Sequence, residues 1–159
     1  MTPRQRVLAA AGRRLPDRTP ADYKAEPEVN RYMMEHLMVD CYEDLLRRLE
    51  IDIRRLEPRY VGPPFKEFED GVFEDYWGIR SKRLKADHGS YDMHVHTPVW
   101  DARSVEDLQQ HAWPWPDIFD YSAMRQQCAR YRDYAVMYEG ADLFTRPCIL
   151  RNMENVMLD

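Results

Sequence analysis

The chain has 159 residues, about the length of one domain and enough to bury a hydrophobic core. Hydrophobic residues make up 44% and charged residues 32%, a composition typical of a globular protein and not of a disordered one. The net charge of -5 gives no general attraction to nucleic acid or to an anionic membrane. No segment approaches the ~20 apolar residues of a membrane span, so we expect neither a nucleic-acid partner nor a membrane partner.

The first residues predict a short helix that begins at Thr2 and Pro3, because proline presets φ and its missing N–H costs nothing at a helix start. Asp40, followed three residues later by Glu43, predicts a capping box for a later helix. The segment IDIRRL (51–56) then predicts a short strand. The early arginines are interpreted as solvated helix residues and not as a nucleic-acid arm; they are Arg4, Arg6, Arg13, Arg14 and Arg18.

Residues 66–100 predict an antiparallel β-meander, because the turn signals Asp70-Gly71 and His88-Gly89 separate alternating runs. Within it, His94 and His96 alternate on a strand, so both side chains point to one face. They are weak candidates for metal ligands, since zinc usually takes three or four protein ligands and no residue is clearly placed to complete the set.

An aromatic cluster in this part of the chain has two interpretations. Its rings could stack on a flat ligand, but such residues more often cover a core or an interface with a missing part, and we favour the second interpretation. The cluster consists of Tyr76, Trp77, Trp100, Trp113 and Trp115.

The last third of the chain predicts helices around one further strand. Ser104 and Asp107 form another capping pair, and the segment YAVMYEG (134–140) predicts a compact strand parallel to residues 51–56. Pro147 predicts the start of a final helix, whose apolar stripe is Ile149, Leu150, Met153, Val156 and Met157. Because parallel sheets are covered on both faces and need several strands, we expect this chain to be a piece of a larger fold.

These segments together resemble the uroporphyrinogen decarboxylase superfamily. The resemblance extends along the chain in many short blocks: TPRQRVLAA, PDRTP, IDIRRLEPRYVGPP, EFEDGVFEDYWGI, SVEDL, WPWPDIFDYSAM, DYAVMYEG and LRNMENVMLD. The block DGVFEDYWGI resembles the branch that contains the cobamide-dependent methyltransferases. Where the decarboxylases carry an arginine-rich signature, this sequence reads TPADYKAEPEV, in which Lys24 is the only cation.

The resemblance implies a (β/α)8 TIM barrel about twice this length, of which the chain is the N-terminal portion. The fold class is then α/β, an incomplete barrel with leading helices and a β-meander insertion. We expect one partial barrel domain over residues 1–159. Its parts are leading helices at 1–50, the first barrel strand and its loop at 51–64, the meander at 66–100, and helices with the second barrel strand at 104–159.

In barrels of this kind the chemistry lies at the carboxyl ends of the strands. Polar and aromatic residues that follow the two predicted strands are therefore the site candidates, although they also suit ordinary loops. The predicted substrate-binding residues are Arg59, Tyr60, Tyr138 and Phe144, and the predicted catalytic residues, suited to proton transfer, are Glu139 and Asp142.

The function that the resemblance implies is decarboxylation of a tetrapyrrole in porphyrin biosynthesis, with this fragment inactive alone. In one alternative, the chain is part of a zinc- and cobamide-dependent methyltransferase, in which a zinc-bound thiolate attacks a methyl group held on cobalt. Zinc and the corrinoid would then belong to a full-length relative, and we expect no cofactor in this chain. Another alternative is a non-catalytic split-barrel half or a truncated remnant.

The expected partners are a small-molecule substrate (a tetrapyrrole or a methyl donor), a complementary C-terminal barrel half and a second copy of the chain. Three cysteines without close spacing favour a reducing cytoplasm over a disulfide framework; they are Cys41, Cys128 and Cys148.

Overall fold

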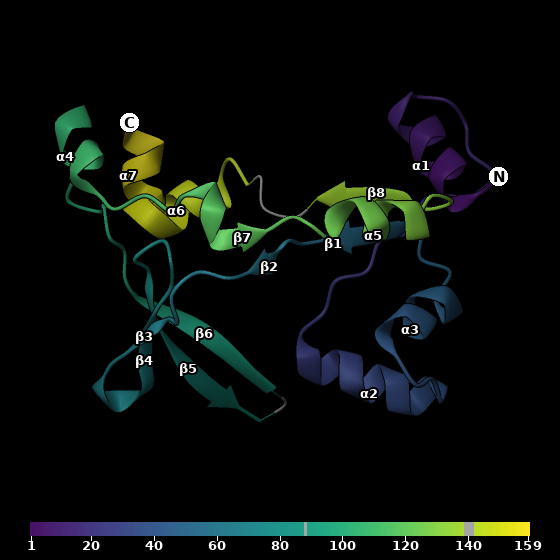
Figure 1. Ribbon diagram of the computed structural model, residues 1–159, viewed down its shortest axis with the longest axis horizontal. Coiled ribbons are helices and arrows are strands. Elements are labelled where there is room, and N and C mark those ends of the chain that lie inside the picture. The colour runs from purple at the N-terminus through teal and green to yellow at the C-terminus, as the bar shows by residue number, and fades with distance from the viewer. Residues whose placement is uncertain (88, 139–141) are drawn as a thin grey trace. The chain divides into compact units, whose positions relative to one another are not determined.

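The computed structural model describes residues 1–87, 89–138 and 142–159. The chain forms two compact units of mixed α/β structure (Figure 1). Unit 1 consists of Met1–Pro58 and Tyr121–Gly140, and unit 2 consists of Arg59–Asp120 and Ala141–Asp159. The described strands form small sheets, and in these residues no sheet closes into a barrel.

Unit 1 contains the pair of parallel strands that the sequence predicts. Strand β1 (Ile53–Leu56) pairs with β8 (Ala135–Tyr138), with Ile53 opposite Ala135 and Leu56 opposite Tyr138. Both strands therefore end at the same edge of the pair. The helices of this unit are α1 (Pro3–Ala11), α2 (Pro27–Leu37), α3 (Tyr42–Arg48) and α5 (Met124–Arg130).

The helix starts in unit 1 confirm one sequence prediction and correct another. Thr2 caps α1 in a full capping box with Gln5. The capping box predicted for Asp40 and Glu43 is wrong, because α3 begins one residue later, after Cys41, without a side-chain cap. The carboxylate of Glu43 instead accepts hydrogen bonds from Arg47 and Arg54.

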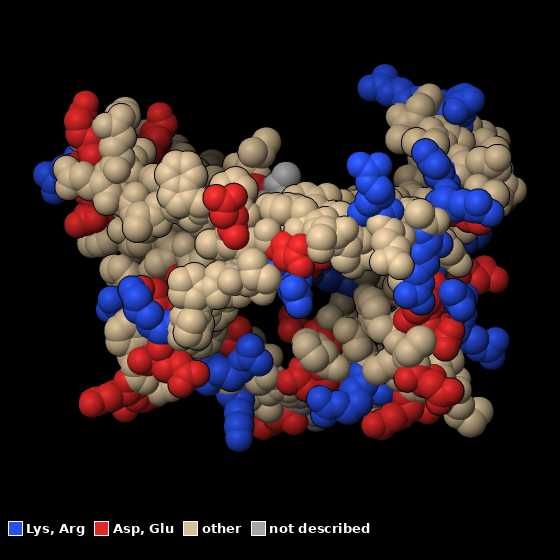
Figure 2. All heavy atoms as spheres, in the orientation of Figure 1, with Lys and Arg blue, Asp and Glu red and all other residues tan. Residues whose placement is uncertain are grey.

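A buried aspartate organises the start of unit 1. Asp52 is fully buried, and its carboxylate accepts hydrogen bonds from Arg6, Arg18 and the backbone N–H of Ala21. Figure 2 shows Lys and Arg side chains gathered around α1, but Arg6 itself is buried. The interpretation of all the early arginines as solvated residues is therefore wrong for Arg6, because a buried carboxylate needs a cationic partner.

Unit 2 is built around the predicted meander. Strands β3 (Lys66–Glu67), β4 (Val72–Glu74), β5 (Arg80–Ala86) and β6 (Gly89–His96) form an antiparallel sheet in chain order (Figure 1). Asp70 and Gly71, in the short 3-10 helix η1 (Glu69–Gly71), both have positive φ, as the predicted turn requires. His88, part of the other predicted turn, lies outside the described residues.

The remaining elements of unit 2 supply a second short pairing and the core. Strand β2 (Arg59–Tyr60) pairs antiparallel with β7 (Phe119–Asp120). The predicted capping box of Ser104 and Asp107 is confirmed at the start of α4 (Val105–Gln110), and the 3-10 helix η2 covers Pro116–Ile118. The buried core consists of Ile79, Val99, Ala102 and Leu150.

The final helix differs from its prediction. The segment forms two helices, α6 (Thr145–Arg151) and α7 (Met153–Leu158), separated at Asn152, which has a φ of 72°. Pro147 is the third residue of α6 and not the first. The break falls at Asn152, whose ψ of 138° is also non-helical and whose side chain accepts a hydrogen bond from the N–H of Glu154, as an N-cap residue does.

Candidate functional site

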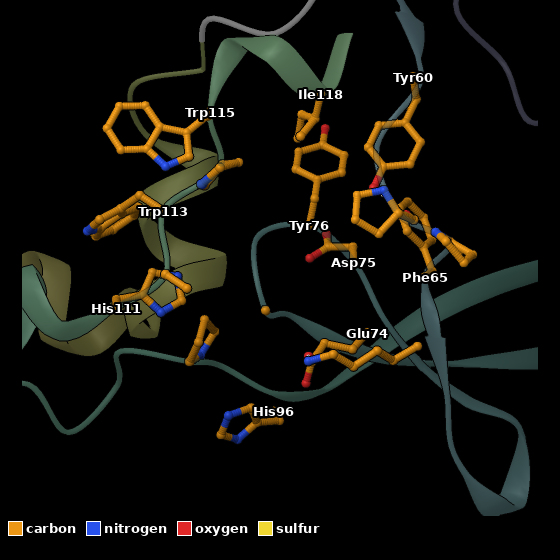
Figure 3. Close-up of a pocket in the computed structure, with 17 residues that line it drawn as sticks. Tyr60, Phe65, Glu74, Asp75, Tyr76, His96, His111, Trp113, Trp115 and Ile118 are labelled. Atoms are coloured by element: carbon orange, nitrogen blue, oxygen red, sulfur yellow. The ribbon is translucent and has the colours of Figure 1, made fainter.

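One concave site among the described residues is a pocket of about 460 Å³ within unit 2 (Figure 3). It lies between the start of the meander and the segment that leads from α4 to η2. The volume is in the range of small-molecule sites, and the lining is mostly aromatic and apolar, as such sites usually are.

One wall is a cluster of packed rings at the start of the meander. Tyr60 stacks on Tyr76 with ring centres 5.5 Å apart, and Phe65 lies 5.4 Å from Tyr60. Phe119 meets Tyr76 edge-on at 5.4 Å. These contacts hold the ring of Tyr76 in place, so this wall is rigid before any ligand binds.

The facing wall comes from the Trp-Pro-Trp-Pro segment. Figure 3 shows His111, Trp113 and Trp115 on one side of the pocket and Tyr76 on the other. The rings of His111 and Trp113 meet edge-on at 4.6 Å. His111 Nε2 lies 3.1 Å from the backbone oxygen of Trp77, which can only accept, so Nε2 carries the proton.

Acidic and imidazole side chains provide the polar part of the pocket. Glu74 is mostly buried and binds Lys66 and Arg80. The hydrogen bond from Lys66, together with that from Arg80, lowers the pKa of Glu74, so this carboxylate is charged at neutral pH. Asp75 accepts the backbone N–H groups of Trp77 and Ile79 through one oxygen.

The predicted substrate-binding residues that follow β1 have different surroundings. The ring of Tyr60 lines the pocket, while its hydroxyl donates to the backbone oxygen of Pro63 at 2.6 Å. Arg59 is exposed and binds Asp120 at 2.9 Å across the β2–β7 pair, away from the pocket lining. The structure therefore assigns Tyr60, but not Arg59, to the concave site.

The predicted residues that follow β8 lie in both units. Tyr138 is half-exposed at the end of β8 in unit 1, whereas Asp142 and Phe144 precede α6 in unit 2. Asp142 accepts the backbone N–H groups of Phe144 and Thr145, and these bonds, chiefly that from Phe144, lower its pKa. Asp142 thus stabilises a loop that leads into a helix, and its catalytic role stays a prediction. Glu139 lies outside the described residues.

The two candidate metal ligands have different surroundings. His94 Nδ1 lies 2.9 Å from Ser81 Oγ, and His96 lines the pocket. Within residues 1–87, 89–138 and 142–159, no group of three or more His, Cys, Asp or Glu side chains is arranged to hold a metal ion.

Comparisons of the chain with protein-family models, with curated proteins and with solved structures yield no match. In the described ranges, none of the helices combines the length and the apolar character needed to traverse a lipid bilayer. The assignment of a function therefore depends on the geometry and on the sequence resemblance.

Sequence reasoning found the pocket only in part. Tyr76, Trp113 and Trp115 belong to the aromatic cluster for which a flat ligand was the less favoured interpretation. Trp77 and Trp100, from the same cluster, do not line the pocket. The sequence signal that could have found the pocket is the Trp-Pro-Trp-Pro segment. A proline after each tryptophan favours an extended backbone at that tryptophan, so the indoles are not part of a helix that packs on the core.

Proposed function

We propose that this chain is part of a small-molecule enzyme of the uroporphyrinogen decarboxylase type, with a tetrapyrrole as substrate. The observation that carries the proposal is the parallel pairing of β1 with β8, in the register that sets Leu56 opposite Tyr138. These are the two segments that the sequence resemblance assigns to the first two strands of a barrel.

Parallel pairing supports the proposal because it is not a local feature of the sequence. Two parallel strands require a crossover connection, and helix α5 stands directly before β8 on that connection. Parallel strands also bring their carboxyl ends to one edge, where enzymes of this architecture place their chemistry. The residues that follow the two strands are then the ones that would contact a substrate.

A methyltransferase is the second candidate, and a specific feature favours it. The segment TPADYKAEPEV contains Lys24 as its only cation, whereas a tetrapyrrole with many carboxylates calls for several guanidinium groups. Residues 70–79, which resemble the methyltransferase branch, comprise the end of η1, strand β4 and the turn from Asp75 to Ile79. In this alternative, the zinc ligands would lie in the other half of the barrel.

The two candidates are separated by titration of the 159-residue chain with uroporphyrin and, separately, with hydroxocobalamin, each followed by the ligand's visible absorbance. Saturable binding of uroporphyrin that weakens in Tyr138→Ala supports the decarboxylase type; binding of hydroxocobalamin alone supports the methyltransferase. Arg83→Ala, which changes an exposed residue of β5, is the matched control and should leave binding unchanged.

Decarboxylation itself is expected only from a completed barrel. The chain alone should form no coproporphyrinogen from uroporphyrinogen, since the catalytic residues of such a barrel come from the ends of several different strands. If folded chain binds neither ligand, the enzyme proposal is wrong and a non-catalytic split-barrel half becomes the better description.

A further inference from the structure

Two tryptophans that line the pocket in unit 2 expose much of their ring surface to solvent. Trp115 is 76% exposed and Trp113 is 39% exposed, and both line the pocket. Exposed indole surface is unfavourable in water, and a ligand between the two walls would cover it. This pocket lies wholly in unit 2, and of the predicted substrate-binding residues only Tyr60 lines it.

The arrangement of the rings restricts the shape of the ligand. Tyr76 is fixed on one side by Tyr60 and Phe119, and the indoles of Trp113 and Trp115 lie on the other side (Figure 3). Facing aromatic walls favour a flat molecule that can stack, and a cavity of about 460 Å³ accommodates one of two or three fused rings.

The polar groups restrict the charge of the ligand. Glu74 is charged and only 12% exposed, and Asp75 is fixed beside it by two backbone N–H groups. Lys66, the cation of the pocket lining, is 74% exposed and binds Glu74, and Arg80 binds the same carboxylate, so the charge of Glu74 is balanced by these two cations. Asp75 is held by neutral backbone N–H groups and therefore supplies the negative charge of the lining. Its carboxylate repels an anion, whereas a cation gains from it and from the faces of the aromatic rings.

We propose that this pocket is a binding site for a planar aromatic cation, stacked between Tyr76 and the indoles of Trp113 and Trp115, with Asp75 providing the negative charge. The site does not depend on the proposed enzyme function: Tyr60 is shared with the predicted substrate-binding residues, but the residues that would contact the cation, Tyr76, Asp75, Trp113 and Trp115, are not among them.

The proposal is tested by calorimetric titration of the full chain with three probes of one ring system: N-methylquinolinium, quinoline and quinoline-2-carboxylate. N-methylquinolinium should bind about tenfold more tightly than quinoline. Quinoline-2-carboxylate should bind most weakly, because the carboxylate of Asp75 repels it. Equal affinity for the cation and the anion, or no binding of any probe by folded chain, would overturn the proposal.

Two variants locate the site and separate stacking from charge. Trp115→Ala should weaken the binding of N-methylquinolinium by about tenfold. Its matched control is Trp100→Ala, which removes an exposed tryptophan of the same unit outside the pocket and should change nothing. Asp75→Asn keeps the acceptor for the Trp77 and Ile79 N–H groups, so it should lower the affinity for the cation while leaving that for quinoline unchanged. Circular dichroism verifies that each variant is folded; a loss in Trp100→Ala equal to that in Trp115→Ala would refute the assignment.

Discussion

The guanidinium carbon of Arg54 lies 3.8 Å from the centre of the Tyr134 ring. Arg54 is fully buried, and it also donates to the Glu43 carboxylate and to the backbone oxygens of Ile51 and Ile53. One side chain therefore connects α3, β1 and the segment just before β8. Removal of such a buried guanidinium group leaves its partners, above all the Glu43 carboxylate, without a compensating charge.

We predict that Arg54→Ala lowers the free energy of unfolding by about 3 kcal/mol, because it leaves Glu43 mostly buried without its closest cation. Urea unfolding followed by circular dichroism measures the change. Arg47→Ala is the control, since Arg47 binds the same carboxylate but is 55% exposed, and its loss should be under about 1 kcal/mol. Equal losses in the two variants would show that burial of Arg54 is not what matters.

The pairing of Asp17 predicts a dependence of stability on pH. Hydrogen bonds from Arg6 and from the N-terminal ammonium group hold the pKa of Asp17 well below its ordinary value of about 3.9. The unfolded chain therefore binds a proton more readily at this residue, so the stabilisation is complete above about pH 4 and is lost as the pH falls below it. The thermal midpoint should fall over this range, and less steeply in Asp17→Asn. Asp117→Asn, at an exposed position of η2, should keep the full slope; identical profiles for all three proteins would contradict the prediction.

The break between α6 and α7 predicts a difference between two substitutions. Asn152 has a φ of 72° and a ψ of 138°, a conformation that costs any residue with a Cβ about 1–3 kcal/mol. Asn152→Ala keeps this cost and loses the side-chain acceptor for the N–H of Glu154, so it should destabilise the chain by about 1 kcal/mol. Asn152→Gly loses the same acceptor but adopts positive φ freely, so it should be the more stable of the two variants. Thermal unfolding of both variants tests the order. A more stable alanine variant would mean that the two helices merge into one.

Strand β8 predicts self-association. In the described part of the chain it pairs with β1 alone, and Val136, Met137 and Tyr138 are all at least 40% exposed. An uncovered strand of a parallel pair attracts further strands. Sedimentation velocity should show larger species as concentration rises, and Val136→Lys should reduce them. Val105→Lys, at an exposed valine of α4, should not; a single monomer peak at every concentration of the unaltered chain would disprove the prediction.

The elements that sequence reasoning predicted correctly are those with a local signal. Thr2 with Gln5, and Ser104 with Asp107, are capping pairs whose partners lie three residues apart, so the chain itself brings them together. The meander followed from Asp70-Gly71, and the strands β1 and β8 followed from two short segments that end before Pro58 and Gly140, although the pairing of these strands joins distant parts of the chain.

The features that were missed depend on residues far apart in the chain. Burial of Arg6 follows from Asp52, and the pocket wall follows from the stacking of Tyr60 on Tyr76, which no short pattern encodes. The break at Asn152 was missed because the apolar stripe continues through it, and periodicity alone does not detect one residue with positive φ.

The short pairing of β2 with β7 has a consequence for how the chain folds. β1 and β8 are separated by a long stretch of polypeptide, and joining their ends would carry a large loop-closure entropy if that stretch were free. Because Arg59 lies opposite Asp120 and Tyr60 opposite Phe119, the stretch enters and leaves at adjacent points. The stretch between β1 and β8 therefore behaves as an insertion within unit 1. Formation of the short β2–β7 pair would bring the two parallel strands close enough to pair with each other.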